Sequence, residues 1–78
     1  MRIYDRVSKH QLDEIVLYLT PADAKQLSDF AAQLAECPDH AHVLDSSLRR
    51  EVTLVVYTDE TLPTLDPESQ AVICDGSD

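Results

Sequence analysis

The sequence contains one glycine, one phenylalanine and no tryptophan in 78 residues. A single glycine excludes the two standard Gly-rich loops that hold nucleotide phosphates. With almost no large aromatic side chains, any core must be built mainly from aliphatic residues. Hydrophobic residues make up 44% of the chain, so such a core is feasible. The length leaves room for one small domain.

Basic residues are also scarce. Six Lys and Arg stand against 15 Asp and Glu, and the net charge is −9. Binding to nucleic-acid phosphates depends on Lys and Arg, so we expect no direct nucleic-acid partner. The same argument disfavours an anionic membrane surface. A protein partner with a basic surface would be compatible with this charge.

The two cysteines, Cys37 and Cys74, form no CxxC motif, and their spacing predicts no disulfide framework. No run approaches the roughly 20 apolar residues that a membrane span needs. The first residues carry charge but lack the apolar core of a signal peptide. Together these features predict a cytoplasmic protein without a membrane association.

The clearest secondary-structure signal is a strand followed by a helix. Residues 15–19 (Ile-Val-Leu-Tyr-Leu) are of types that favour a strand, which we expect over residues 12–19. Thr20 is then a good N-cap, Pro21 suits the first helical position, and Asp23 completes a capping-box pattern. The predicted helix ends before Pro38. Its expected buried face consists of Leu27, Phe30, Ala31 and Leu34.

Two further strands are predicted, over residues 41–45 and 51–58. The second alternates Val52, Leu54 and Val56 with Thr53, Val55 and Tyr57. Connection lengths then favour an α+β fold with a small antiparallel β-α-β-β sheet of order 1-3-2 and one helix packed on one face. Residues 1–11 alternate weakly, so either an extra N-terminal strand or a loosely ordered arm is compatible with the sequence. We assign this domain to residues 1–58.

Residues 59–78 differ in character. They contain six acidic residues, two prolines and the only glycine, but no Lys or Arg. Low hydrophobicity and like-charge repulsion predict a flexible acidic tail. The apolar run at residues 71–74 is the exception, since it could dock on another part of the chain.

One group of side chains could hold a metal. His40 and His42 would point to the same face of a strand, and Cys37 lies three residues upstream of His40. Thiolate and imidazole are zinc ligands, but this spacing matches no finger pattern and no fourth ligand is evident. The alternative is that both histidines are surface residues of an edge strand. We therefore predict no metal and no cofactor, with these three residues as the only candidate ligands.

No catalytic group is predicted. Asp13 and Glu14 are adjacent, so on a strand their carboxylates would point to opposite faces and could not act as a close acid–base pair. A single helix on a small sheet offers little cleft for such a pair. The sequence therefore favours a protein that is not an enzyme.

The expected sheet has more apolar residues than one helix can cover. Val16, Tyr18, Val55 and Tyr57 would cluster on the second face, and we predict that they form an interaction surface. The N-terminal arm, the tail or another chain could cover it, and a second copy is favoured because small domains often need oligomers for stability. The resulting hypothesis is a homodimeric, acidic, non-enzymatic protein-interaction module that acts as an inhibitor, immunity-type or regulatory factor on a protein partner. The alternative is a metal- or small-ligand-binding module at the segment containing Cys37, His40 and His42.

Overall fold

A computed structural model describes residues 1–74. Its elements in chain order are β1 (Ile3–Asp5), β2 (His10–Leu12), α1 (Pro21–Glu36), β3 (His40–Leu44), β4 (Glu51–Val55), a 3₁₀ helix (Leu62–Thr64) and α2 (Pro67–Cys74). The described residues form two antiparallel two-stranded sheets, β1–β2 and β3–β4. The α+β class is confirmed.

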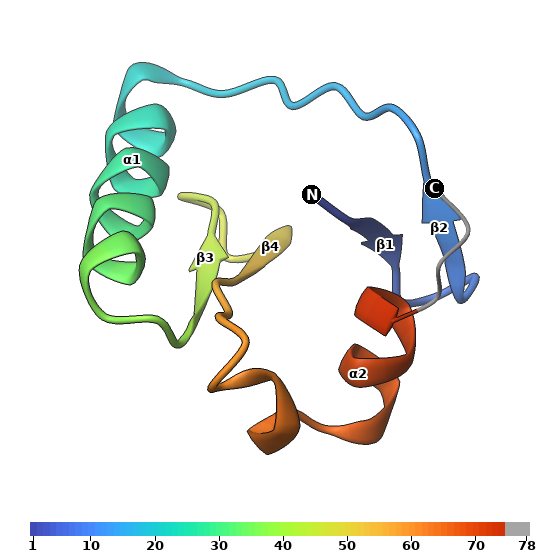
Figure 1. Cartoon of the computed structure of the whole chain (residues 1–78). Coiled ribbons are helices and arrows are strands. Elements are labelled where there is room, and N and C mark those ends of the chain that lie inside the picture. The colour runs from blue at the N-terminus through green and yellow to red at the C-terminus, as the bar shows by residue number, and fades with distance from the viewer. Residues whose placement is uncertain (75–78) are drawn as a thin grey trace.

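The elements form two groups joined by extended chain. The helix α1 lies against the β3–β4 hairpin on one side of the molecule, and the β1–β2 hairpin lies with α2 on the other (Figure 1). The connection between β2 and α1 runs across the width of the molecule, and the chain after β4 returns to α2 on the opposite side. The fold is therefore an open arrangement of two small units.

The helix α1 begins where the sequence predicts. The Thr20 hydroxyl accepts a hydrogen bond from the Asp23 N–H at 3.1 Å, and the Asp23 carboxylate accepts from the Thr20 N–H at 3.5 Å. This capping box satisfies donors that have no intrahelical partner. At the other end, the Cys37 N–H donates to the Gln33 carbonyl, and Pro38 prevents further helix.

The β3–β4 hairpin turns around Asp45. Its carboxylate accepts hydrogen bonds from the backbone N–H groups of Arg49 and Arg50 and from the Ser47 hydroxyl. These bonds stabilise the ionised form and hold the pKa of Asp45 below its usual value. Leu48 lies in this turn with φ of 58°, in the left-handed region that a leucine occupies only at a steric cost.

The core lies between α1 and β3. Among the described residues only Leu34, on α1, and Val43, on β3, are buried, with 6% and 8% of their surface exposed. The pair Val43↔Val52 and the pair Ala41↔Leu54 face the same side of the hairpin. Of the predicted helix face, Leu27 and Phe30 are only half-buried and Ala31 is exposed.

The acidic C-terminal region contains a helix where the sequence predicts a flexible tail. The Arg2 guanidinium donates to the carbonyl oxygens of Val72 (3.4 Å) and Ile73 (3.2 Å), near the C-terminus of α2. The Tyr4 hydroxyl donates to Glu68 Oε2 at 2.9 Å, and Lys9 Nζ lies 3.3 Å from the same oxygen. The composition of residues 59–78 could not predict these contacts, because their partners lie in the first nine residues of the chain. Asp75 and Asp78 lie outside the described residues, and the division into domain and tail stays a prediction.

The strand predicted over residues 12–19 is wrong. Strand β2 ends at Leu12, and residues 15–19 form no strand although every residue there favours one. The sequence preference for a strand produces a ladder only where a partner edge is in reach. Within residues 1–74, β2 pairs with β1, and β4 pairs with β3 only. The single sheet of order 1-3-2 is therefore replaced by two hairpins, and of the two N-terminal alternatives the strand is observed, at Ile3–Asp5.

Candidate interaction surface

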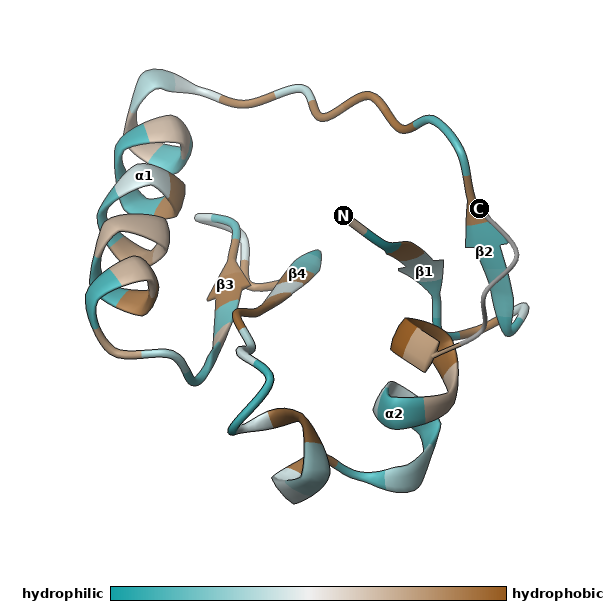
Figure 2. Cartoon of the chain, in the orientation of Figure 1, coloured by the Kyte–Doolittle hydropathy of each residue, from teal (hydrophilic) through white to brown (hydrophobic). Residues whose placement is uncertain are grey.

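The linker segment (residues 15–19) is the most exposed apolar stretch of the described chain. Tyr18 is 92% exposed and Val16 is 64% exposed, whereas Ile15, Leu17 and Leu19 are 43–45% exposed. This alternation matches the two faces expected from the sequence, but the face expected to be buried is only partly covered. Figure 2 shows the segment as a hydrophobic band on the connection between β2 and α1.

The backbone of the linker segment also lacks hydrogen bonds within the described chain. Its N–H and C=O groups make no hydrogen bond to any other residue of the described chain. Such groups remain bonded to water in the free protein. A partner strand could replace that water, since an extended peptide with free backbone groups is what strand addition requires.

Between the linker segment and the hairpin lies a groove of about 370 Å³. Its wall on the linker side is formed by residues 16–19, and its floor includes Leu27 of α1, Val43 of β3 and Val52 of β4. Asp23, Asp45 and Arg50 also line the groove. The lining is thus aliphatic with a few charges, a composition suited to an apolar side chain of a partner.

The structure places the four predicted surface residues in two separate positions. Val16 and Tyr18 line the groove beside the Arg50 end of β4. Val55 pairs with His40 at the opposite end of that strand, and Tyr57 follows it. Val55 and Tyr57 are 38% and 40% exposed. Residues 15–19 do not pair with β4 in the described chain, so no shared sheet brings the four residues together, and their use as one interaction surface stays a prediction.

The imidazoles of His40 and His42 lie side by side on the face of β3 that points away from α1. Their ring centroids are 5.3 Å apart, in an edge-to-face arrangement. His40 Nδ1 lies 3.1 Å from Asp39 Oδ1, and His42 Nδ1 lies 3.1 Å from Glu51 Oε1 and 3.0 Å from Thr53 Oγ1. Among residues 1–74, no three His, Cys, Asp or Glu side chains converge as metal ligands would. Cys37 is exposed and carries a free thiol.

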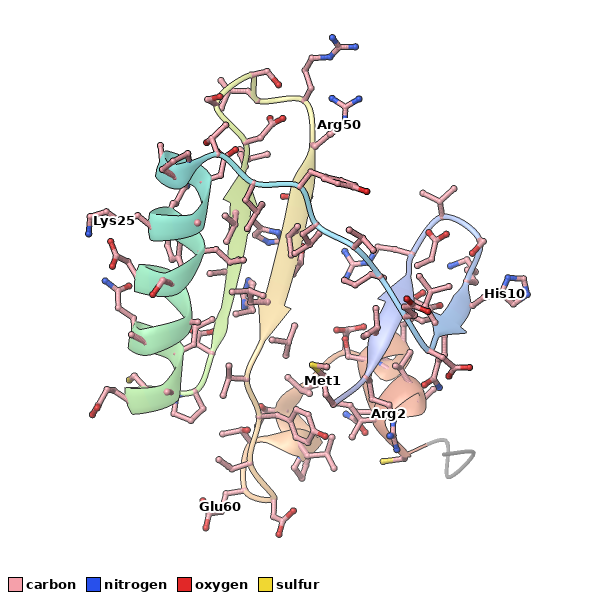
Figure 3. The ribbon with its side chains drawn as sticks, turned by 90° about the horizontal axis from the view of Figure 1, so that it is seen from above. Met1, Arg2, His10, Lys25, Arg50 and Glu60 are labelled. Carbon is pink, nitrogen blue, oxygen red and sulfur yellow. The ribbon has the colours of Figure 1, made fainter. Side chains whose placement is uncertain are left out.

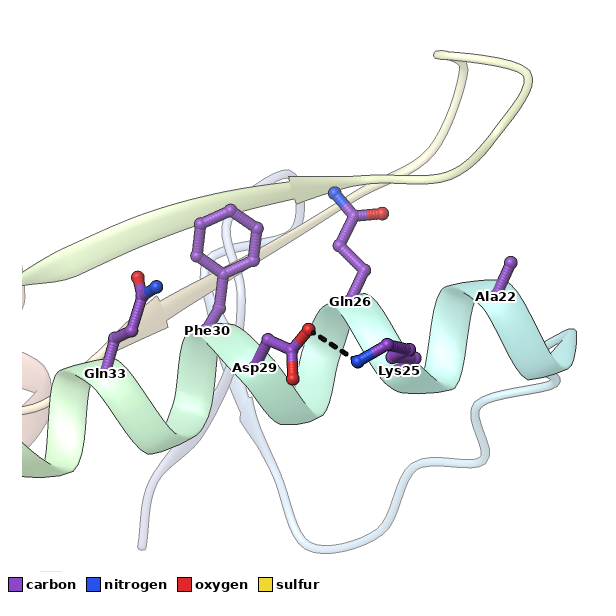
Figure 4. A pocket seen from close by; sticks show the side chains of 6 residues that line it. All are labelled: Ala22, Lys25, Gln26, Asp29, Phe30 and Gln33. Atoms are coloured by element: carbon purple, nitrogen blue, oxygen red, sulfur yellow. Dashed lines mark hydrogen bonds and ion pairs between the residues drawn. The ribbon is translucent and has the colours of Figure 1, made fainter.

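A second depression of about 430 Å³ follows one side of α1. All its lining residues belong to that helix, and Figure 4 shows Phe30 and Gln26 rising from it on the side of β3. Lys25 Nζ and Asp29 Oδ2 are 3.2 Å apart in an i, i+4 ion pair. No second element supplies a converging group, so this depression is a helix surface without evident chemistry.

Sequence reasoning missed part of the groove. It assigned Leu17, Leu19 and Leu27 to the core, and it gave no role to Leu44, which also lines the groove and is 38% exposed. The available signal was the number of aliphatic residues, which is large for a chain with one long helix to cover them. That number shows that some aliphatic residues must stay exposed, but it does not show which ones.

The comparisons with known proteins gave no relative. No family model, no curated protein and no solved structure matches this chain. Within residues 1–74, neither helix has the length and apolar character needed to cross a bilayer.

Proposed function

We propose that this chain is a small, acidic, non-enzymatic protein-interaction module that acts as an inhibitor, immunity-type or regulatory factor on a partner with a basic surface. The single observation that carries the proposal is the linker segment. It offers five consecutive apolar residues, all at least 43% exposed, with unpaired backbone groups beside an aliphatic groove.

The physical gain from covering this surface is substantial. Apolar area removed from water contributes about 25 cal/mol per Å², and a partner strand would add backbone hydrogen bonds. Association costs offset part of this gain, so the affinity depends on a few well-packed anchors rather than on area. Tyr18 is the natural anchor, because its ring is 92% exposed and tyrosine is enriched at interface centres.

The net negative charge supports the second part of the proposal, a partner with a basic surface. A net charge of −9 on 78 residues favours fast association with a basic protein and disfavours acidic partners. This term is screened by salt, so it sets the rate of encounter more than the final affinity.

The shifted carboxylates of the described residues support a role other than catalysis. Three of the four carboxylates with lowered pKa values, Asp5, Asp45 and Asp66, accept hydrogen bonds from neighbouring backbone or serine groups, and the fourth, Glu68, accepts them from Tyr4 and Lys9. Each of the three organises a turn or a helix start in this way. None of them lies in a cleft with a second titratable group of matching role, as acid–base catalysis requires.

The test uses a photo-reactive amino acid in place of Tyr18, with the same substitution at Tyr4 as a matched control. Tyr4 is half-buried and bonded to Glu68, so it should capture little. A protein captured at position 18 is then purified and titrated against the wild-type chain and against Tyr18→Asp. We expect the Tyr18→Asp variant to weaken binding at least about tenfold and added salt to slow association. Equal capture at both positions, or a titration unaffected by Tyr18→Asp, would contradict the proposal.

The alternative of a metal- or small-ligand-binding module at Cys37, His40 and His42 gains no support from the geometry of the described residues. It makes a separate prediction. Stoichiometric zinc binding by calorimetry, lost in a His40→Ala, His42→Ala double variant, would favour it.

A further inference from the structure

The β3–β4 hairpin has two free edges, and their backbone groups can be identified from the register. The Asp45 N–H donates to the Arg50 carbonyl, and the Val56 N–H donates to the Asp39 carbonyl. Hydrogen-bonded pairs in an antiparallel ladder recur every second residue. Glu51, Thr53 and Val55 therefore direct their N–H and C=O groups away from β3, to the free edge of β4. No strand of the described chain pairs there.

The two edges are not equivalent. The helix α1 lies on the β3 side of the hairpin, whereas β4 lies on the side away from it (Figure 3). Natural edge strands are usually protected from other chains by lysine, proline, a bulge or an inward charge. Strand β4 reads Glu-Val-Thr-Leu-Val, with no lysine and no proline, and its four residues after Glu51 are uncharged. It is an edge without protection.

The segments that flank β4 carry opposite charges, and Glu51 is the only charged residue of the strand itself. Arg49 and Arg50 precede the strand, and Asp59 and Glu60 follow within a few residues of its end; all four are exposed. Figure 3 shows Arg50 and Glu60 at opposite ends of β4. When two copies of such a strand pair antiparallel, the basic end of each lies beside the acidic end of the other. Antiparallel pairing thus favours contacts between these flanking charges, whereas parallel pairing would bring the two arginines of each copy together and the two acidic residues together.

The exposed area supports an additional subunit. The chain exposes 6273 Å². A compact monomer of its mass exposes about 4,700 Å², so roughly 1,500 Å² is in excess. The radius of gyration of 13.3 Å likewise exceeds the value of about 11.5 Å for a compact chain of this length. A standard interface removes about 800 Å² from each partner, which this excess can supply.

We propose that the free edge of β4 binds β4 of a second copy, antiparallel about a two-fold axis, and forms a four-stranded sheet of order β3-β4-β4-β3. Centred on Leu54, the pairing places Thr53 opposite Val55 of the second copy and Val52 opposite Val56. The apolar side of the hairpin then continues from one copy into the other, beside each groove. The pairing uses the outward backbone groups of β4 and not those of the linker segment, so this inference does not rest on the proposed function.

The first test measures mass and amide exchange on the wild-type chain. Sedimentation at micromolar concentration should report twice the chain mass of 8.7 kDa. The amides of Glu51, Thr53 and Val55 should be protected in the dimer and lose protection on dilution, whereas those of His42 and Leu44 on the β3 edge should exchange fast throughout. A monomer would overturn the proposal, and so would a dimer that protects the β3 edge or neither edge. Protection of β4 that is independent of concentration would also overturn it, because the linker segment of the same chain would then cover the edge.

The second test uses proline at the two edges. Thr53→Pro removes an outward N–H of β4, and His42→Pro removes the corresponding N–H of β3 from the directly opposite position. Both variants lose the contact between His42 and Thr53, and His42→Pro also loses the contact between His42 and Glu51, so the control perturbs the hairpin at least as much as the test variant. We expect Thr53→Pro to raise the dimer dissociation constant at least about tenfold and His42→Pro to leave it nearly unchanged. Equal effects would overturn the proposal.

The third test exchanges charges and remains informative if proline disrupts the hairpin. One variant carries Arg49→Glu and Arg50→Glu, and the other carries Asp59→Lys and Glu60→Lys. Each alone brings like charges together at both ends of the paired strands and should dissociate. Their mixture restores opposite charges at both ends and should form a heterodimer at low salt. Failure to form one would overturn the antiparallel arrangement. The Tyr18→Asp variant, which tests the proposed function, should still dimerise like the wild-type chain.

Discussion

Replacement of Leu34 by alanine tests whether α1 is held on the hairpin by the small core that the structure shows. Leu34 is 6% exposed and, with Val43, is one of only two buried residues in the described chain. Leu→Ala removes roughly three methylene equivalents, or about 2.4 kcal/mol of transfer free energy. A residual cavity would add to this, but a site so near the surface can collapse, so we expect about 2.5 kcal/mol in total.

That loss is large for this protein. At about 0.05–0.15 kcal/mol per residue, a chain of this size is stable by roughly 4–12 kcal/mol. A loss of about 2.5 kcal/mol should lower the melting temperature by roughly 10–20 °C. The assay is urea unfolding followed by circular dichroism, with every variant at the same concentration because association would add to apparent stability.

Leu48→Ala is the matched control, because Leu48 is the same residue type but 74% exposed in the hairpin turn. It should change the free energy of unfolding by less than about 0.5 kcal/mol. If Leu34→Ala costs no more than Leu48→Ala, α1 is not docked on β3 through this core. The reasoning about the fold would then be refuted.

Three further predictions follow from local contacts. Leu48→Gly should stabilise the protein by about 0.5–1 kcal/mol in the same urea assay, because glycine adopts the φ of 58° without steric cost, and a loss of stability would contradict that backbone conformation. Deletion of residues 67–78 should speed amide exchange in β1 and β2 but not in β3, because Arg2 and Tyr4 lose their partners on α2, and unchanged exchange would show that α2 does not hold the hairpin. The Tyr4 hydroxyl and Lys9 lower the pKa of Glu68, so its contribution is complete above its ordinary value of 4.5 and is lost as the pH falls through the lower folded value; Glu68→Gln should remove this component of the acid transition measured by urea unfolding.

Local features of the chain could be predicted because they depend on neighbouring residues. The N-cap at Thr20, proline at the first helical position and Pro38 after the helix act within a few residues, and α1 has the expected bounds. The hairpin of β3 and β4 was also predicted, although each strand differs from its expected limits by one to three residues. Val16, Tyr18, Val55 and Tyr57 are each at least 38% exposed, and their use as a binding surface stays a prediction.

By itself, the sequence determined the capped helix, the strand propensities, the aliphatic composition and the strong negative charge, since each depends only on residue type and close spacing. The tertiary structure alone decided which strands meet. The N-terminal residues pair with β2, which leaves residues 15–19 extended and β4 with a free edge. It also decided that α2 contacts Arg2 and Tyr4. Arg2 lies 70 residues before its partner Val72, and Tyr4 lies 64 residues before its partner Glu68. Pairing between distant segments depends on chain closure and on competition among partners, and no local pattern encodes the outcome.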